Sequence, residues 1–470
     1  MNPLHVEVAI IGAGTAGMSA YRAARAHADS VLLIEGGVYG TTCARVGCMP
    51  SKLLIAAAEA AHLARHAHAF GVQVQAVAVD GAAVMARVQR ERDRFVNSVL
   101  ETIDAIAPLD RLATKVNFQD ANTLLTAHGQ LIHARRIVIA TGSMPVLPAV
   151  VKGLGAHLLT NENIFDLPTL PASLAVFGPG VLGLELAQAM SRLGVRVKVF
   201  GVGGGIAGIQ DLAIRDYANQ TFNNEFYLDA SADVKSVTET AAGVEVNYLH
   251  RDGTWRAEPF DYVLAATGRA PVVTGLGLEH TGLQLNDRGV PLFDRFTLQC
   301  GDSAIFIAGD ASNDSPLLHE AADQGRIAGE NAARFPDVRP GLRRTPLAVV
   351  FTDPQVASVG FNLKQLEQHH KGRFAVGLVS FEDQGRSRIM LRNQGLLKVY
   401  GEQGTGLFLG AEMFGPAAEH IGHLLAWAAQ QRMTVSSMLD MPYYHPVIEE
   451  GLRTALRDLN RKLHLEAPVD

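Results

Sequence analysis

The run Val6-Glu-Val-Ala-Ile-Ile-Gly12-Ala-Gly14-Thr-Ala-Gly17 is the strongest indication of the fold in this sequence. Its first six residues are nearly all apolar, as in a parallel strand that is buried on both faces. The three glycines then permit a tight turn, let the backbone approach a pyrophosphate, and let a helix lie against the strand. Residues 18–25 fit that helix. The stretch therefore predicts a strand, a turn and a helix that bind a dinucleotide.

A carboxylate follows where such a site needs one. Residues 31–34 form the next apolar strand, which ends on Glu35. A carboxylate about 20 residues after the glycines can accept a hydrogen bond from the 2′-hydroxyl of an adenosine ribose. Gly12, Gly14, Gly17 and Glu35 are therefore predicted to bind the first nucleotide.

The same pattern recurs after the apolar strand at residues 174–177, with Gly178, Gly180 and Gly183. This duplication predicts a second dinucleotide in a second α/β domain. The strand that follows ends on Gly201, where a ribose-binding carboxylate is expected, and the next residues supply no arginine for a 2′-phosphate. A duplicated fold that has lost its ligand is the alternative.

Three further strands end in short turns that fit crossings between nucleotide-binding units. Two of them end in Ala-Thr-Gly, and the third ends in Gly-Asp. An acid at such a turn can hold a sugar-like hydroxyl. The residues predicted from these turns are Thr141, Gly142, Gly268 and Asp310.

Two cysteines lie close together in the run Gly40-Thr-Thr-Cys43-Ala-Arg-Val-Gly-Cys48-Met-Pro-Ser-Lys52. Closing so short a loop would stabilise a chain by only roughly 2 kcal/mol, which a chain of this size does not need. We therefore interpret Cys43 and Cys48 as a dithiol/disulfide pair that exchanges electrons with what the glycine-rich unit binds.

The backbone between the cysteines is expected to be irregular. Positions five apart on an ideal helix differ by about 140° in azimuth, so Cys43 and Cys48 do not share one face of a regular helix. Gly47 and Pro50 are expected to supply the irregularity. Both thiols would then lie near the start of a helix, where the helix dipole and Lys52 favour a thiolate.

The C-terminal part of the chain offers a general base. Leucines recur at helical spacing from residue 452 to residue 463. Pro446 suits the first position of that helix and would place His445 at its cap. Histidine can take a proton from an incoming thiol near neutral pH, and a carboxylate would orient its ring. By position, either Glu449 or Glu450 could be that carboxylate.

Composition excludes several classes of protein. The 470 residues carry a net charge of −6, which argues against nucleic acid or an anionic membrane as partner. Three cysteines exclude a disulfide-stapled secreted framework, and Cys300 is expected in the core. With no signal segment and no membrane span expected, we predict a soluble cytoplasmic protein. His62 and His66 have helical metal-ligand spacing but no accompanying carboxylate or thiol, so no metal site is expected.

Taken in order, these motifs resemble the class I pyridine nucleotide–disulfide oxidoreductases, the flavoprotein family of dihydrolipoamide dehydrogenase, glutathione reductase and mercuric reductase. The resemblance runs nearly end to end. It implies two Rossmann-like dinucleotide-binding domains, for FAD and NAD(P), followed by a C-terminal α+β dimerisation domain. We expect the FAD domain at residues 1–150 and 270–345, the NAD(P) domain at 151–269, and the dimerisation domain at 346–470.

The resemblance also implies roles for the predicted residues. Lys52 and Glu185 resemble the family's ion pair beside the flavin. Cys48 matches the thiol that faces the flavin, and Cys43 the thiol that exchanges with substrate. His445 and Glu450 match a catalytic dyad that reaches the cysteines of the partner subunit of a homodimer. The residues implied to contact FAD are Gly12, Gly14, Gly17, Glu35, Thr141, Gly142 and Asp310, and those implied to contact NAD(P) are Gly178, Gly180, Gly183 and Gly268.

The expected substrate is dihydrolipoamide, oxidised with FAD and NAD⁺, because Ser51 resembles dihydrolipoamide dehydrogenases. The final residues contain no second cysteine pair, which argues against mercuric reductase. Departures from the pattern are Arg45, a bulky cation between the cysteines, Val447 after His-Pro, and Gly201, which leaves NADP open. The alternatives are a diaphorase or quinone reductase, a reductase of glutathione disulfide or a similar disulfide, and the peripheral subunit of a 2-oxo-acid dehydrogenase complex.

Overall fold

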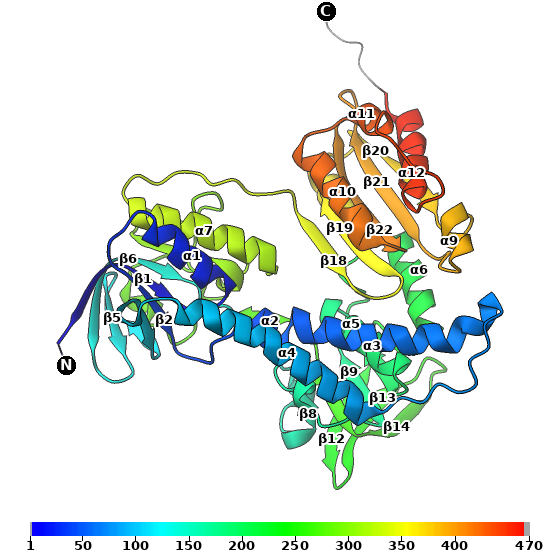
Figure 1. Ribbon diagram of the computed structural model, residues 1–470, viewed down its shortest axis with the longest axis horizontal. Helices are drawn as coiled ribbons and strands as arrows, with labels where there is room; N and C mark the ends of the chain where they lie inside the picture. The colour runs from blue at the N-terminus through cyan, green and yellow to red at the C-terminus, as the bar shows by residue number, and fades with distance from the viewer. Residues whose placement is uncertain (1, 465–470) are drawn as a thin grey trace, which may run out of the picture.

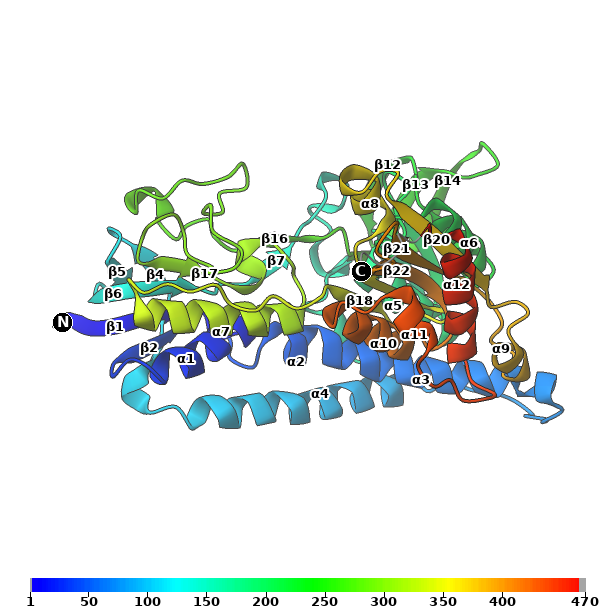
Figure 2. The same cartoon turned by 90° about the horizontal axis from the view of Figure 1, so that it is seen from above.

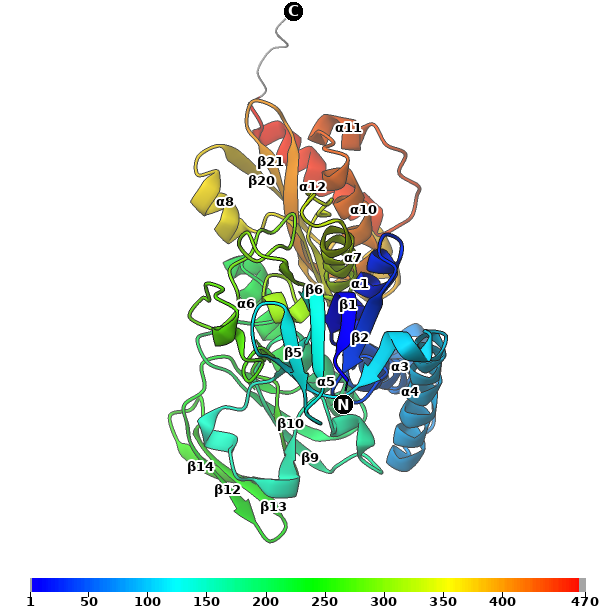
Figure 3. The same ribbon diagram turned by 90° about the vertical axis from the view of Figure 1, so that its left-hand side faces the viewer.

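The computed structural model describes residues 2–464, which form three units built on β-sheets (Figure 1). The first unit occupies the left of Figure 1, and the second and third units lie at the lower and upper right. In Figure 3 the third unit and the sheet of β12 (Val234–Thr240), β13 (Gly243–Leu249) and β14 (Trp255–Phe260) lie at opposite ends of the molecule.

The first unit is a largely parallel sheet in the order β3-β2-β1-β6-β5-β4, with β17 paired to β6. Helices α1 (Thr15–Arg25) and α7 (Leu318–Arg334) lie together on this sheet (Figures 1 and 2). They approach closely because Gly325 and Gly329 of α7 have no side chain. A Cβ at either position would overlap the backbone of α1. The strands are β1 (Leu4–Ile11), β2 (Val31–Glu35), β3 (Arg111–Ala113), β4 (Val116–Phe118), β5 (Thr123–Thr126), β6 (Leu131–Ile139) and β17 (Ile305–Ile307).

The second unit repeats this plan with a parallel sheet in the order β11-β10-β9-β15-β8 and helices α5 (Val181–Arg192) and α6 (Leu212–Asn223). A three-stranded antiparallel sheet adjoins it. A short pair, β7 (Ser143–Pro145) with β16 (Arg269–Pro271), lies where the chain crosses between units. The other strands are β8 (Leu158–Leu159), β9 (Ser173–Phe177), β10 (Arg196–Phe200), β11 (Tyr227–Asp229), β12 (Val234–Thr240), β13 (Gly243–Leu249), β14 (Trp255–Phe260) and β15 (Tyr262–Ala265).

The third unit is a five-stranded antiparallel sheet in the order β18-β19-β22-β21-β20. Its strands are β18 (Leu347–Val350), β19 (Gln355–Gly360), β20 (Phe374–Ser380), β21 (Leu396–Glu402) and β22 (Phe408–Gly415). Its helices are α8 (Leu363–His369), α9 (Gly385–Ile389), α10 (Ala418–Gln430), α11 (Val435–Leu439) and α12 (Glu449–Lys462).

Two long helices connect the units. A short helix, α2 (Thr42–Val46), leads into α3 (Cys48–His66), and α4 (Gly81–Asp104) runs beside α3 along the length of the molecule (Figure 2). Apolar side chains of α3 share one buried core with α5 of the second unit. The segment that contains Cys43 and Cys48 therefore lies where the first unit meets the second.

The predicted fold class is confirmed, with two Rossmann-type units and a C-terminal α+β unit. The expected domain boundaries stay a prediction. The expected start of the last helix was wrong: α12 begins at Glu449, and Pro446 lies before it. The Val447 carbonyl accepts a bond from Gln384 in place of a helical N–H, and the Val447 N–H bonds the Glu450 carboxylate as at a helix N-terminus. No helix within residues 2–464 is both long and apolar enough to cross a membrane.

The glycines of the two repeats follow the same steric rules. Gly12 has a φ of 110° and Gly178 a φ of 106°, which L side chains rarely adopt. A Cβ at Gly17 would overlap the Gly12 carbonyl oxygen, and one at Gly183 would overlap that of Gly178. The third glycine of each unit is thus required for the helix to pack against the turn.

We therefore expect Gly17→Ala to lower the free energy of unfolding of the apo protein by about 3 kcal/mol, because the methyl group has no room. Urea titration measures this. Gly14→Ala is the matched control, since a Cβ at Gly14 meets nothing within 4 Å and its φ is −75°. It should cost no more than about 1 kcal/mol. Equal losses in the two variants would contradict the steric argument.

Candidate functional site

Three neighbouring clefts contain most of the predicted residues. The first-unit cleft, of about 560 Å³, is lined by Gly12, Gly14, Glu35, Thr141 and Gly142 among others. Glu35 stands at the end of β2, and its Oε2 accepts a 2.8 Å hydrogen bond from the N–H of Ala13 in the glycine turn. The open space at the Cα of Gly14 leaves room for a phosphate group beside the backbone.

The thiol cleft, of about 310 Å³, adjoins the first and shares Gly14 and Gly142 with it. Its lining brings together five predicted residues from distant parts of the chain: Cys43, Cys48, Lys52, Glu185 and Asp310.

The second-unit cleft, of about 830 Å³, adjoins the thiol cleft and shares Asp310 with it. Gly178, Gly180 and Gly268 line it, while Gly183 packs behind the turn. A dinucleotide in each outer cleft could therefore reach the thiol cleft past the residues that the clefts share.

The two cysteines stand on separate helices. Cys43 lies in α2 and Cys48 is the first residue of α3, with Gly47 at φ −131° and ψ −119° between them. Gly47 thus breaks the helix as expected, whereas Pro50 lies inside the first turn of α3, where its missing N–H costs nothing. Cys48 therefore stands at the positive end of a long helix.

The thiols differ sharply in acidity. A hydrogen bond from Cys43, helped by the charge of Lys52, lowers the pKa of Cys48 to about 6. The same hydrogen bond, together with burial, raises the pKa of Cys43. In the reduced pair these shifts favour a Cys48 thiolate beside a protonated Cys43.

The predicted ion pair is present. Lys52 Nζ lies 2.7 Å from Glu185 Oε2, and the Glu185 side chain is only 2% exposed. The second oxygen of Glu185 accepts a 2.9 Å hydrogen bond from the N–H of Phe351, whose ring lies under the Lys52 ammonium. Glu185 is thus bonded at both oxygens, as a buried carboxylate must be.

Sequence reasoning missed a polar relay beside Asp310. Ser143 Oγ donates to Asp310 at 2.6 Å, and Arg269 donates to both Ser143 and Asn161. Asn161 in turn donates to the carbonyl of Val46 in α2. Ser143 and Arg269 each follow an Ala-Thr-Gly turn directly, a signal that could have identified them. Asn161 has no such local signal.

Arg45 does not lie at the thiols, contrary to the expectation from its position between them. It lines the first-unit cleft, and its Nη1 donates to the carbonyl of Val38 at 2.9 Å. The helix breaks at Gly47, so α2 is a separate short helix. Its side chains therefore need not point in the same direction as the Cys48 side chain. Arg45 therefore adds a positive charge to the first-unit cleft.

His445 and Glu450 form the predicted pair. His445 Nδ1 lies 3.0 Å from Glu450 Oε1, and this hydrogen bond, with that from Val447 N–H, lowers the pKa of Glu450. Glu450, rather than Glu449, is thus the orienting carboxylate. The His445 side chain is 82% exposed, and none of the third-unit residues described, up to residue 464, lines the thiol cleft of the same chain.

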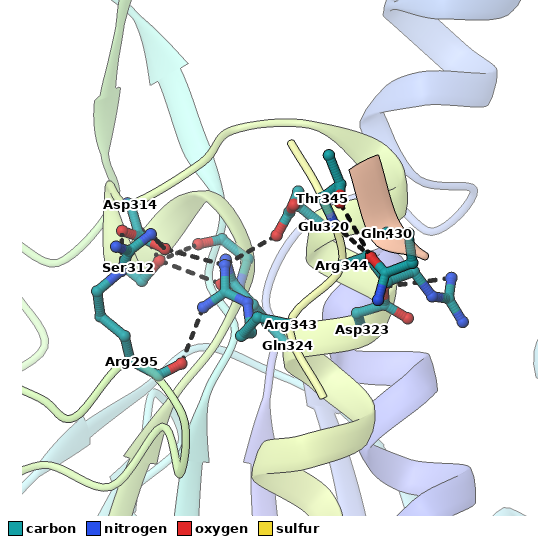
Figure 4. A network of polar contacts seen from close by, with 11 residues as sticks. Arg295, Ser312, Asp314, Glu320, Asp323, Gln324, Arg343, Arg344, Thr345 and Gln430 are labelled. Carbon is teal, nitrogen blue, oxygen red and sulfur yellow. Dashed lines mark hydrogen bonds and ion pairs between the residues drawn. The ribbon is translucent and has the colours of Figure 1, made fainter. Parts of the chain in front are cut away.

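A buried network holds the segment that leads into the third unit (Figure 4). Arg343 Nη2 donates to Asp314 at 3.0 Å and to Glu320, in the first turn of α7, at 2.8 Å. Gln324 of α7 accepts a 2.8 Å bond from the N–H of Gly309, the residue before Asp310. The loop that carries Asp310 is therefore fixed to α7 and to the linker together.

Cys300 is fully buried, and burial raises its pKa to about 12, in keeping with a core residue. Within residues 2–464, no three His, Cys, Asp or Glu side chains are grouped so that they could hold a metal ion.

Comparison with known proteins agrees with this geometry. A family model described as "Pyridine nucleotide-disulphide oxidoreductase" matches residues 6–325, and the dimerisation-domain model of that name matches residues 347–456. A mercuric reductase of Shigella flexneri is 31% identical over 97% of this chain and 81% of its own length. A dihydrolipoyl dehydrogenase of Geobacillus stearothermophilus is 29% identical over 98% of both chains.

Solved structures show the same fold. LpdA from Mycobacterium tuberculosis is 26% identical, with a TM-score of 0.82 over 96% of this chain and 99% of its own. A flavoprotein disulfide reductase, RclA from Escherichia coli, solved as a Cu(II) complex, is 23% identical, with a TM-score of 0.81 over 97% and 99%. The comparisons confirm the family resemblance predicted from the sequence. They do not confirm the substrate, because the relatives span more than one substrate class.

The acidity of Cys48 can be measured directly. In the reduced protein, we expect its alkylation by iodoacetamide to rise with pH around a midpoint near 6. Cys43→Ala removes the hydrogen-bond donor, so the midpoint should move upward toward the ordinary thiol value. Mass spectrometry of the Cys48 peptide follows the reaction, with buried Cys300 as the unreactive internal control. An unchanged midpoint in Cys43→Ala would rule out the hydrogen bond as the cause.

Proposed function

This chain belongs to the pyridine nucleotide–disulphide oxidoreductase family, and we propose that it passes electrons between a small dithiol, the Cys43–Cys48 pair, FAD and NAD(P). The best candidate substrate is dihydrolipoamide. The observation that supports this most is the cleft that brings Cys43 and Cys48 beside the Lys52–Glu185 pair, between two glycine-rich turns.

The first unit suits FAD, the flavin that the family uses. Gly14 leaves space for a diphosphate, and Glu35 lies at the ribose end of the cleft. Arg45 adds a cation there, and Asp310 would lie toward the thiols. Bound here, FAD would supply two-electron chemistry that links the thiol pair to a nicotinamide nucleotide.

The residues of this chain account for the thiol steps. Glu450 holds Nδ1 of His445, so Nε2 is free to take the proton of a substrate thiol. The substrate thiolate attacks the Cys43 sulfur, the Cys43–Cys48 bond breaks, and Cys48 leaves as a thiolate. A low pKa makes Cys48 the better leaving group. The second substrate thiol then displaces Cys43, so the substrate becomes a disulfide and the pair is left reduced.

The dyad is proposed to serve the opposite subunit of a homodimer. The dimerisation-domain match and the exposed His445 support this assignment. Beside the dyad is an apolar cleft of about 480 Å³, lined in part by Leu424, Trp427, Met441 and Tyr444. Trp427 is 66% and Tyr444 80% exposed in the single chain, and a second copy would cover them.

Steady-state kinetics with a panel of acceptors and donors tests the function. We expect dihydrolipoamide to be turned over, and Cys43→Ser to lower that rate by at least about 1,000-fold because the exchanging sulfur is lost. Quinone reduction by NADH or NADPH should persist in the same variant, since it needs no thiol pair.

The panel includes glutathione disulfide, Hg(II) and quinones, because mercuric reductases are among the relatives. Faster turnover of any of these than of dihydrolipoamide would replace the proposed substrate. If Cys43→Ser left every activity unchanged, the chain would be a diaphorase. Co-purification with an acyltransferase core would instead support the peripheral subunit of a 2-oxo-acid dehydrogenase complex.

Mixed dimers test the shared site. Cys43→Ser and His445→Gln homodimers should each be inactive toward the dithiol. A mixed dimer of the two has one intact site if the dyad acts across the interface, so random reassembly of equal amounts should restore about a quarter of wild-type activity. Unmixed variants treated identically are the control. No recovery in a verified mixed dimer would place the dyad and the thiols in the same chain.

A further inference from the structure

The two nucleotide-binding units can be compared residue by residue within this chain. The N–H of Gly12 donates to the carbonyl of Ile34 at 2.7 Å, and the N–H of Gly178 donates to that of Phe200 at 2.8 Å. These bonds fix the register of the two repeats. Gly201 therefore occupies the position of Glu35.

The same register places Pro179 where the first unit has Ala13. In the first unit, the N–H of Ala13 holds the Glu35 carboxylate at the nucleotide. Proline has no N–H, so the second unit lacks both the carboxylate and the backbone donor that would orient it.

The space for a side chain at Gly201 is closed as well. A Cβ there would lie 2.6 Å from Cγ of Pro179 and 2.8 Å from the carbonyl oxygen of Ala230. Neither the proline ring nor the backbone can move aside cheaply. The packing of this turn therefore excludes a carboxylate side chain at residue 201, and restoring one would require the backbone to shift.

No other charge replaces it in the cleft. The charged residues among those that line the second-unit cleft are Arg269 and Asp310. Both also line the thiol cleft and are tied to Ser143, so they belong to the end nearest the thiols. The lining near the adenosine end is uncharged, and includes Gly201, Val202, Ala232 and Val234.

We infer that the second unit does not select between NAD(H) and NADP(H) by charge and accepts both. A carboxylate at this position accepts a hydrogen bond from the 2′-hydroxyl and repels a 2′-phosphate, whereas an arginine pairs with the phosphate. With neither present, the 2′-group has no charged partner. This inference rests on the proposed function only in requiring that a nicotinamide nucleotide reduce the bound flavin.

Anaerobic stopped-flow reduction of the FAD-loaded dimer tests it, with flavin bleaching as the readout and no disulfide substrate present. We expect the second-order rate constants for NADH and NADPH to agree within about tenfold. A larger preference for either nucleotide, or no bleaching by either, would overturn the inference. Bleaching by both without turnover of any disulfide would leave it standing and would instead refute the proposed function.

Substitutions at Val202 sharpen the test, because this residue lines the cleft next to Gly201 and is 92% exposed, with room for a longer side chain. Val202→Arg should shift the NADPH/NADH rate ratio toward NADPH by at least about tenfold, and Val202→Glu should shift it as far toward NADH. Val202→Gln, similar in size but uncharged, should stay within about threefold of the wild type. If neither charged variant moves the ratio while both retain FAD, the 2′-group does not lie at this end and the inference fails.

Discussion

One buried carboxylate joins all three units of this protein. Glu185 extends from α5 of the second unit, binds Lys52 on the helix that begins with Cys48, and accepts a hydrogen bond from Phe351 at the entrance to the third unit. A carboxylate that is 2% exposed is costly to leave unpaired, so these partners must stay in place together. The position of the thiols relative to both nucleotide clefts depends on this contact.

The surroundings of Glu185 reinforce that arrangement from two sides. One turn further along α5, Gln188 exchanges hydrogen bonds with the backbone of Asp353. Arg343 holds the loop that leads from Asp310, which lines the thiol cleft, into α7. The thiol cleft is thus a junction of rigid elements, and the segment between the cysteines, broken at Gly47, is its irregular part.

Local patterns in the sequence predicted most of this structure. The glycine turn, Glu35 at the end of β2 and Cys48 at the start of α3 lie where local patterns predicted, because each position depends on neighbours in the same stretch of chain, while their binding and redox roles stay predictions. Features that depend on distant contacts were not predictable. Asn161 reaches α2 from another unit, and Arg45 lines the first-unit cleft because α2 ends before Gly47. Helix α12 starts late because the Val447 carbonyl bonds Gln384 and not a helical N–H. The Lys52–Glu185 pair was placed through family resemblance, since no local rule joins residues so far apart.

Because the glycine turn is duplicated, two related sequences can be compared within one chain. Gly17 and Gly183 obey the same steric demand, whereas Glu35 and Gly201 have diverged at one point of the same scaffold. Packing fixes the third glycine in both copies, whereas at the ribose position it admits a carboxylate in one copy and excludes any side chain in the other. The two copies thus keep one architecture while a local change in packing, at Pro179 and Ala230, removes a recognition group from the second.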